Sequence, residues 1–396
     1  MRILYVYDGD WPKGATRVEK ETRSLAQAGH MVLLVARNTD RAVRREWNAW
    51  MEIQRLPSFG PRWLNYALNF PLFLNPVWLW SIWQAARRFK AERIVVADLP
   101  LAPSAVWIGW LTGLPVDYDM AEIYPEFLRA RWEVDRMRLS DHLVRSPRAA
   151  SWMEQWVLRR VRNVFVVSEE SAERCRRLGV SADRVHVVGN TPEFPEMLSA
   201  PAPAPDSLAP WAGRPLILFV GILIADRGVM KAVEAMPLVL KDVPDAVLVV
   251  VGDGTDRPHV ERRIRDLRLE RSVAMLGWQP HTSLPGYYQQ AQVGLIPFLD
   301  SSHIRITLAN KLFDYMAAGL PVIAVDVPPM RRILDETRAG VLYAPGDADG
   351  LSRAIVSLLR DGTTRQDLSQ RGKRAIAEKY RWSEDARVFV SAVNGA

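Results

Sequence analysis

The chain has 396 residues, 48% of them apolar and 24% charged, which excludes a disordered protein and suits two globular domains better than one ordinary core. The single cysteine excludes an internal disulfide framework and agrees with a reducing cytoplasm. Because Cys175 stands in the charged helical run SAERCRRLG, we expect a structural thiol and not a nucleophile.

The net charge of +7 comes entirely from the first half of the chain. Residues 1–190 carry 28 Lys and Arg against 21 Asp and Glu, whereas residues 191–396 carry 24 of each kind. Twelve of the fifteen tryptophans precede residue 157. A basic half rich in tryptophan indicates either nucleic acid or an anionic membrane surface as a partner. The sequence has no helix-turn-helix, zinc-finger or RNP pattern, so we favour the membrane and expect no nucleic acid.

The first predicted elements form a βαβ unit. Met1 leads directly into a strand over residues 2–8, which leaves no room for a signal peptide. We therefore expect a cytoplasmic protein that associates with the cytoplasmic face of the membrane. A helix over residues 16–28, stopped by Gly29, precedes a second strand over residues 31–37. Two strands joined by a helix predict a parallel sheet.

The segment from Trp63 to Ala86 contains 24 residues without a charge, and the basic run RRFKAER follows it. That length suffices to span a bilayer, but Pro71, Pro76 and three asparagines break the segment into shorter pieces. A spanning helix, a segment lying in the membrane interface and a buried helix pair all stay open as interpretations. We expect residues 63–93 to make peripheral contact with an anionic membrane.

The strand and helix alternation continues along the whole chain and predicts an α/β fold of two doubly wound parallel sheets. Between the two halves, Asn190–Pro215 holds seven prolines without apolar periodicity, which indicates a semi-rigid spacer. We place the first domain at residues 1–198, a linker at 199–213 and the second domain at 214–381. Two such units would place a cleft between them, facing the carboxyl ends of both sheets. Further strands are predicted at Arg93–Asp98, Leu114–Met120, Asn163–Ser168, Val185–Gly189, Leu216–Gly221, Ala246–Gly254, Val273–Trp278, Val293–Phe298, Pro321–Asp326 and Gly340–Ala344.

Small and charged residues follow two strands of the second domain. FVGILIADRG places Gly221 at a strand end and Arg227 just beyond it. The next strand ends on Gly252, Asp253 and Gly254. Glycine lets the backbone approach a ligand closely, and the arginine fork suits a diphosphate. An ordinary turn is the alternative at each position.

The stretch NKLFDYMAAG predicts a helix that holds an anion. If Asn310 caps the helix, Lys311 lies in the first turn, where the helix dipole disfavours a cation unless an anion binds there. Asp314, one turn further on, presents a carboxylate that can accept hydrogen bonds from the diol of a ribose. A solvated lysine and a surface aspartate remain the alternative.

Taken in order, FVG…DRG, VGDG, LGW and NKLFDYMAAGLPVIA resemble the donor-binding domain of glycosyltransferase family 4, retaining enzymes of the GT-B fold. ADLPLAP, VDYDMAEIYPE and VVSEES in the first half resemble the acceptor-side domain. The resemblance implies that Arg227 binds the donor diphosphate, that Asp314 holds the ribose and that Gly277 and Trp278 frame the base. It also implies that residues 382–396 return to the first domain.

Three positions depart from the family pattern: Ile222, Ile306 and Ala121 stand where the family has Arg, Glu and His. His303 and Arg305 are candidate replacement contacts, and Asp119, Glu122 and Glu126 form a carboxylate cluster on the acceptor side. We assign four residues to catalysis: Glu122, Asp119, Arg227 and Lys311. We assign eleven residues to the donor: Gly221, Arg227, Gly252, Asp253, Gly254, Trp278, His303, Arg305, Asn310, Lys311 and Asp314.

The resemblance implies transfer of a sugar from a nucleoside-diphosphate donor to a hydroxyl of a lipid-linked or polysaccharide acceptor, with retention. The six histidines lack ligand spacing, so we expect neither a metal nor another cofactor. Two alternatives remain open. A nucleotide-sugar epimerase would share the fold, and a non-catalytic scaffold subunit would explain the three departures.

Overall fold

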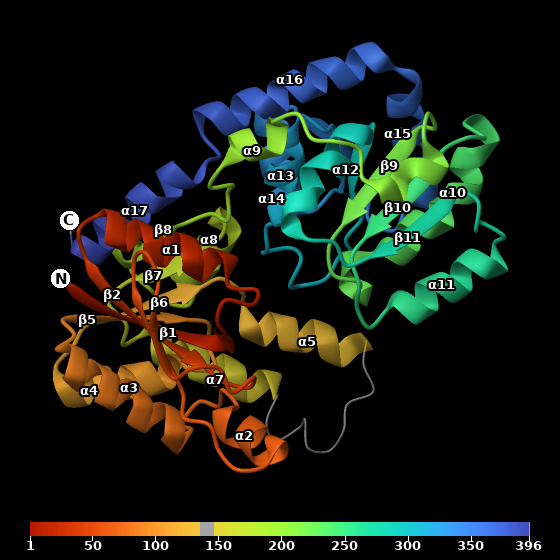
Figure 1. Cartoon of the computed structure of the whole chain (residues 1–396). Coiled ribbons are helices and arrows are strands. Elements are labelled where there is room, and N and C mark those ends of the chain that lie inside the picture. Colours follow the sequence, from red (N-terminus) through yellow and green to blue (C-terminus); the bar gives the residue numbers. More distant parts are fainter. Residues whose placement is uncertain (135–145, 396) are drawn as a thin grey trace. The chain divides into compact units, whose positions relative to one another are not determined.

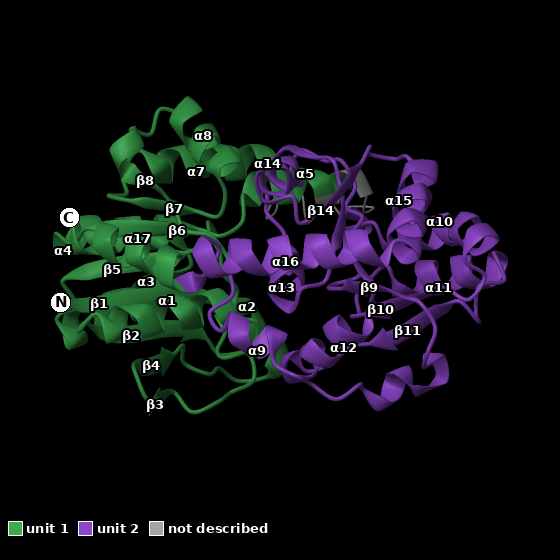
Figure 2. Cartoon of the chain, turned by 90° about the horizontal axis from the view of Figure 1, so that it is seen from above, with its two compact units in different colours: residues 1–190, 383–396 green, residues 191–382 purple. Residues whose placement is uncertain are grey.

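The computed structural model describes residues 1–134 and 146–395 and divides the chain into two compact units (Figure 2). Unit 1 comprises Met1–Asn190 and Ser383–Ala396, and unit 2 comprises Thr191–Trp382. Each unit is a sheet of mainly parallel strands covered by helices. The predicted α/β class with two doubly wound sheets is therefore confirmed.

The sheet of unit 1 has eight strands in the order β3-β4-β2-β1-β5-β6-β7-β8. Its central strands are buried on both faces, as continuous runs of Val, Ile and Leu predict for parallel strands. Figure 1 shows α3, α4 and α7 on one face of this sheet and α1 and α17 on the other. The elements are β1 (Arg2–Asp10), α1 (Thr16–Gln27), β2 (Met31–Arg37), β3 (Arg45–Trp47), β4 (Glu52–Arg55), α2 (Arg62–Asn69), α3 (Pro76–Phe89), β5 (Arg93–Ala97), α4 (Ala102–Thr112), β6 (Val116–Met120), α5 (Tyr124–Val134), α7 (Pro147–Leu158), β7 (Val164–Val166), α8 (Glu169–Arg177), η1 (Ala182–Arg184), β8 (Val185–Val187) and α17 (Trp382–Asn394).

The short antiparallel pair of β3 and β4 at the edge of this sheet is absent from the sequence predictions. β3 is only three residues long and largely exposed, so it has too little apolar alternation to be detected.

The last helix, α17, packs on unit 1. Asn163 Nδ2 donates to the Ala392 carbonyl at 3.0 Å, and the Gly189 N–H donates to Asp385 Oδ1 at 2.8 Å. Phe389 packs edge-on against Phe165 of β7, with ring centroids 4.7 Å apart. Unit 1 is therefore assembled from two segments far apart in the sequence.

The uncharged segment that begins at Trp63 forms two helices, α2 and α3, with a turn between them. The described residues include no helix long and apolar enough to cross a membrane. The three asparagines of the segment are buried, and Asn75 fastens the turn. Asn75 Oδ1 accepts from the Val77 N–H at the start of α3, and its amide donates to the Leu68 and Phe70 carbonyls.

Unit 2 has a six-stranded parallel sheet in the order β11-β10-β9-β12-β13-β14. α10 packs against α15, and α13 packs against α9, α12 and α16. Buried aliphatic and aromatic side chains of these elements form one core. The elements are α9 (Pro195–Ser199), η2 (Asp206–Trp211), β9 (Leu216–Val220), η3 (Ala225–Arg227), α10 (Val229–Asp242), β10 (Val247–Val251), α11 (Arg257–Asp266), β11 (Val273–Gly277), η4 (His281–Ser283), α12 (Leu284–Gln290), β12 (Val293–Ile296), α13 (Asn310–Ala318), β13 (Val322–Val325), α14 (Pro328–Thr337), β14 (Gly340–Tyr343), α15 (Ala348–Arg360) and α16 (Gly362–Glu378).

The proline-rich stretch, predicted as a semi-rigid spacer, packs on the core of unit 2. Leu198 of α9 and Leu208 of η2 are buried in the core of unit 2, and Ser207 hydrogen-bonds to Tyr287 at 2.7 Å. These contacts give the stretch enough buried apolar surface to hold a fixed conformation, which composition alone did not reveal.

Candidate active site

Two strand ends of unit 2, those of β9 and β10, lie together because glycine occupies the points of closest approach. A Cβ at Gly252 would lie 1.9 Å from the Gly221 carbonyl oxygen, and one at Gly254 would lie 2.3 Å from the Leu223 oxygen. Gly221 and Gly252 have φ of +146° and +143°, a region that other residues rarely adopt. The ends of β9 and β10 therefore form a tight backbone edge that only glycine permits.

Lys311 reaches this edge from the first turn of α13. A Cβ on Gly221 would lie 2.8 Å from Lys311 Nζ, so the glycine makes room for the ammonium group. Tyr315, one turn further along α13, fixes the helix to β9 because its hydroxyl accepts from the Val220 N–H at 3.0 Å. The helix is thus held with its first turn against the end of β9.

The Lys311 ammonium group is shielded from solvent and has no hydrogen-bond acceptor among the described residues. It lies 3.9 Å from the Phe219 ring centroid and 5.2 Å from that of Phe298, and such cation–π contacts stabilise a cation only in part. Burial lowers the pKa of Lys311 well below its usual value, and the nearby charge of Arg227 lowers it further, while Asp314 opposes both. A buried cation without an acceptor indicates a place for an anion.

Arg227 lies beside Lys311, with its guanidinium carbon 4.7 Å from the centroid of the same Phe298 ring. It ends the short helix η3, and Gly228 follows with φ of +67°. A Cβ at Gly228 would lie 1.7 Å from the Pro297 oxygen, so glycine allows the Arg227 loop to pack on the end of β12. Both cations lie over the Phe298 ring, and Lys311 also lies over the Phe219 ring. We call these two rings the aromatic floor; the sequence predictions did not include it.

One prediction at this helix is wrong and one alternative is excluded. Asn310 does not cap α13: the N-cap position is Ala309, no side chain caps the helix, and Asn310 is exposed as its first residue. The helix begins one residue earlier than an Asn310 cap would place it, because Ala309 is the last residue with extended backbone angles. The alternative of a solvated lysine is excluded by the burial of Lys311 Nζ.

Asp314 is partly buried on the same helix, and its charge helps to raise the pKa values of Tyr288 and Tyr315, for which burial is the main cause. The geometry therefore brings together five of the predicted donor residues: Gly221, Gly252, Arg227, Lys311 and Asp314.

Other predicted donor residues lie in different surroundings. Asp253 pairs with Arg257 at 3.1 Å. Trp278 follows β11, the edge strand, and is 72% exposed. His303 is buried, with Nδ1 3.4 Å from the Thr307 hydroxyl, whereas Arg305 is exposed and pairs with Asp300 at 2.7 Å. His303 thus lies in the protein interior and Arg305 at the surface. The structure does not bring the two side chains together to replace the glutamate that the family has at position 306.

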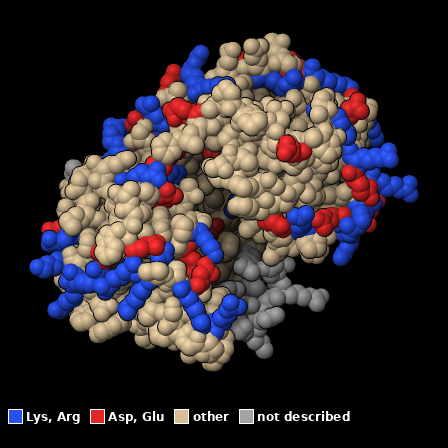
Figure 3. Space-filling model, viewed as in Figure 1, with Lys and Arg blue, Asp and Glu red and all other residues tan. Residues whose placement is uncertain are grey.

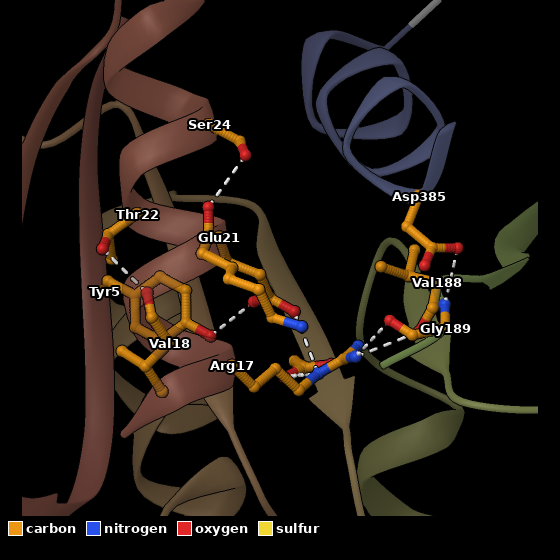
Figure 4. A network of polar contacts seen from close by, with 11 residues as sticks. Tyr5, Arg17, Val18, Glu21, Thr22, Ser24, Val188, Gly189 and Asp385 are labelled. Atoms are coloured by element: carbon orange, nitrogen blue, oxygen red, sulfur yellow. Dashed lines mark hydrogen bonds and ion pairs between the residues drawn. The ribbon is translucent and has the colours of Figure 1, made fainter. Parts of the chain in front are cut away.

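In unit 1, Asp119 of β6 is fully buried and forms an ion pair with Arg17 of α1. Figure 4 shows Arg17 reaching from α1 toward Val188 and Gly189. Arg17 Nη2 and Nε donate to the two carboxylate oxygens at 2.7 and 2.9 Å, and Nη1 donates to the carbonyls of Val188 and Gly189 at 3.0 and 3.2 Å. These bonds occupy both side chains. The carboxylate of Asp119 thus has a structural partner in Arg17, and its assignment to catalysis stays a prediction.

Glu21 and Tyr5 complete this network. Glu21 Oε1 lies 3.0 Å from Arg17 Nε, and the Tyr5 hydroxyl donates to Glu21 Oε2 at 2.5 Å. Burial and the nearby charge of Asp119 raise the pKa of Glu21 to about 8, although Arg17 opposes this. One buried arginine thus contacts two carboxyl groups, and Glu21 holds a proton near neutral pH.

Two further carboxylates stand at the carboxyl ends of neighbouring strands in unit 1, Asp8 at the end of β1 and Asp98 just after β5. Burial raises the pKa of Asp8 to about 6. Burial and the charges of Asp8, Asp119 and Glu122 raise the pKa of Asp98. Neither residue was selected from the sequence, although an aspartate near the carboxyl end of each buried strand was a detectable signal. Glu122 stays a candidate, whereas Glu126 is paired with Arg129.

Among residues 1–134 and 146–395, no three His, Cys, Asp or Glu side chains are grouped so that they could hold a metal ion. Cys175 is buried, and burial raises the pKa of its thiol to about 12, which agrees with the predicted structural role.

Two parallel-sheet α/β units, one of them with a paired cation site at the uncapped start of a helix, define a GT-B type protein. Residues 14–191 match the family model of a glycosyl transferase 4-like domain, and residues 214–361 match that of glycosyl transferases group 1. The chain belongs to the GT-B glycosyltransferases of the family 4-like group.

Curated relatives match between 42% and 58% of the chain. An uncharacterised glycosyltransferase of Methanocaldococcus jannaschii is 28% identical over 176 residues, 44% of this chain and 44% of that protein. The phosphatidyl-myo-inositol mannosyltransferase of Mycobacterium leprae is 29% identical over 168 residues, 42% of this chain and 43% of that protein. The chain thus spans less than half the length of these relatives.

Solved structures match over the whole chain. Sucrose-phosphate synthase from Thermosynechococcus elongatus has a TM-score of 0.78 at 20% identity, covering 100% of this chain and 98% of that chain. Anabaena HepE in complex with UDP-glucose has a TM-score of 0.73 at 15% identity, covering 100% of both chains. These likenesses show the fold.

Proposed function

We propose that the protein transfers a sugar from a nucleoside-diphosphate sugar to a hydroxyl group of a lipid-linked or polysaccharide acceptor, with retention and without a metal ion. The observation that carries this proposal is the buried Lys311 ammonium group beside Arg227, with no hydrogen-bond acceptor among the described residues. A diphosphate supplies anionic oxygens that the Lys311 ammonium group can bind and that the arginine fork of Arg227 suits.

Chemically, the reaction requires stabilisation of the diphosphate as the bond to the sugar breaks. Arg227 and Lys311 supply two positive charges, and the uncapped start of α13 supplies backbone N–H groups. Asp314, near the start of the same helix, accepts hydrogen bonds from the ribose. With the diphosphate charge neutralised by side chains, the departure of the leaving group needs no metal ion.

The named relatives support the donor and acceptor classes. HepE was solved with UDP-glucose, and the Mycobacterium leprae relative is named for mannosyl transfer to a phosphatidylinositol. Retention is implied by the family likeness. The base and sugar of the donor are left to experiment.

A lipid-linked acceptor agrees with the surface of α2 and α3. Trp63 and Trp80 are 71% and 59% exposed, and Leu74 is exposed in the turn between the helices. Figure 3 shows Lys and Arg side chains spread over the visible face of unit 1, with fewer acidic ones among them. Peripheral contact of residues 63–93 with an anionic membrane is part of the proposal. Flotation with anionic liposomes at moderate salt tests it, and a protein that stays in the soluble fraction would contradict it.

The donor assignment is tested by thermal shift with UDP-, GDP-, dTDP- and ADP-sugars, because a ligand that binds only the folded state raises the melting temperature. We expect one base to give a shift that Arg227→Ala abolishes and Arg214→Ala, on the same unit, leaves unchanged. No shift with any donor would favour the scaffold alternative. A new nucleotide sugar formed from donor alone would favour the epimerase.

A further inference from the structure

A groove on unit 1 lies outside the candidate active site. It has a volume of about 510 Å³ and is lined by α4, the start of β6, and the end of α7 with the residues that follow it. We call it the tryptophan groove and define it by Trp107, Gly109, Trp110, Trp156, Arg160 and Arg162. Its volume is typical of small-molecule sites.

The groove is apolar on its walls and exposed at its rim. Trp110 is 76% exposed and Trp107 is 45% exposed, with their rings in an edge-on contact. Leu111 beside them is also exposed. A Cβ at Gly109 would lie 2.4 Å from a methyl carbon of Val116, so glycine lets α4 pack closely on β6 below the groove. Tryptophans of this exposure on one helix are unusual on a surface that meets only water.

Two arginines give the groove its charge. Arg160 stacks on the Trp156 ring at 4.3 Å and donates to the Trp156 carbonyl at 3.0 Å. Arg162 is exposed on the same wall. Neither forms an ion pair in the described part of the chain, and no carboxylate lines the groove. An apolar channel with a cationic rim complements an amphiphile with an anionic head.

We propose that the tryptophan groove binds one anionic phospholipid of the membrane surface, with an acyl chain along the tryptophan wall and the phosphate at Arg160 and Arg162. The groove includes the amino end of β6, whereas the candidate carboxylates stand at the carboxyl ends of the strands, about 17 Å away along five residues. The lipid is therefore a docking ligand and not the acceptor. Aromatic side chains of this kind prefer the membrane interface.

The first test is flotation of the full chain with vesicles of phosphatidylglycerol and phosphatidylcholine. Each arginine near an anionic surface contributes about fivefold to binding, so Arg160→Gln with Arg162→Gln should weaken binding about 30-fold, and Trp110→Glu should weaken it further. The matched control is Arg45→Gln with Trp47→Glu, an exposed pair on β3 at the opposite edge of the sheet. Equal losses in control and groove variants would overturn the proposal.

The second test uses a phosphatidylglycerol with a photoreactive acyl chain in the same vesicles. We expect adducts on peptides that contain residues 106–116 and 156, lost in Trp110→Glu while circular dichroism stays unchanged. Adducts confined to residues 63–93 would show that the groove takes no lipid. A chain that forms a dimer, dissociated by Trp110→Glu without any lipid adduct, would identify a second copy as the occupant and also overturn the proposal.

Discussion

Replacing Lys311 by methionine should separate the stability of the protein from its ability to bind donor. Methionine has a similar length but needs no acceptor, so Lys311→Met removes a desolvated cation without leaving a large cavity. We expect the free protein to be as stable as the wild type or more stable. Affinity for the nucleoside diphosphate should fall about 10- to 100-fold, the loss of one charge-assisted hydrogen bond of roughly 1.5–3 kcal/mol.

The pH dependence follows from the lowered pKa of Lys311. Between its folded pKa and the unfolded value of 10.5, the unfolded chain holds a proton on this lysine that the folded chain lacks. Wild-type stability should therefore rise with pH in that window, by up to about 1.4 kcal/mol per pH unit, and Lys311→Met should lose this slope. A bound diphosphate favours the ammonium form, so donor binding should take up a proton and strengthen as pH falls.

Titration calorimetry in two buffers of different ionisation enthalpy measures both affinity and proton uptake, and urea unfolding measures stability. The matched control is Lys231→Met, an exposed lysine of α10 that pairs with Glu234. If Lys311→Met binds UDP, GDP, ADP and dTDP within about twofold of the wild type and keeps the same proton uptake, the diphosphate assignment is refuted.

Three other substitutions test the two units. Glu21→Gln mimics the protonated carboxyl. The folded pKa of Glu21, about 8, lies above the unfolded value of 4.5, so wild-type stability falls as pH rises between these values. In urea titrations the variant should lose this slope, whereas the control Glu19→Gln should keep it. Arg17→Met leaves Asp119 as a buried unpaired charge and should cost about 3–5 kcal/mol in unfolding free energy; a loss below 1 kcal/mol would contradict the buried ion pair. Gly221→Ala places a Cβ 2.8 Å from Lys311 Nζ at a φ of +146°. We expect unfolding free energy to fall by roughly 1–3 kcal/mol and donor binding, measured by calorimetry, to weaken. Wild-type stability and binding would show that the close approach is not required.

The strands of unit 2 and the glycines at the ends of β9 and β10 could be predicted because each depends on a pattern of residues adjacent in the sequence. Gly221 and Gly252 follow buried runs directly, and Lys311 stands at the start of the helical run NKLFDYMAAG. Contacts between distant residues were not predictable in this way. Asp117 and Asp119 alternate with apolar residues in β6 as exposed side chains do, yet both are buried because Arg93 and Arg17 reach them from other elements.

The N-cap of α13 was predicted wrongly, at Asn310, for a different reason. Asparagine is a frequent cap, but the backbone leaves extended geometry one residue earlier, at Ala309. The aromatic floor of Phe219 and Phe298 was missed because a phenylalanine in a strand is ordinarily core, and only the fold shows a cation above it.

Because α17 packs on unit 1, the two units are completed in a fixed order during synthesis. Ribosomes release residues from the amino end, so the continuous segment 191–382 is complete before the residues that supply Asp385, Phe389 and Ala392 emerge. Until then Phe165 lacks its contact with Phe389, and the Asn163 amide has Asp117 as an acceptor but not the Ala392 carbonyl. The portion made first is thus the last to mature, and a nascent chain stalled before residue 383 would carry a finished second unit beside an unfinished first one.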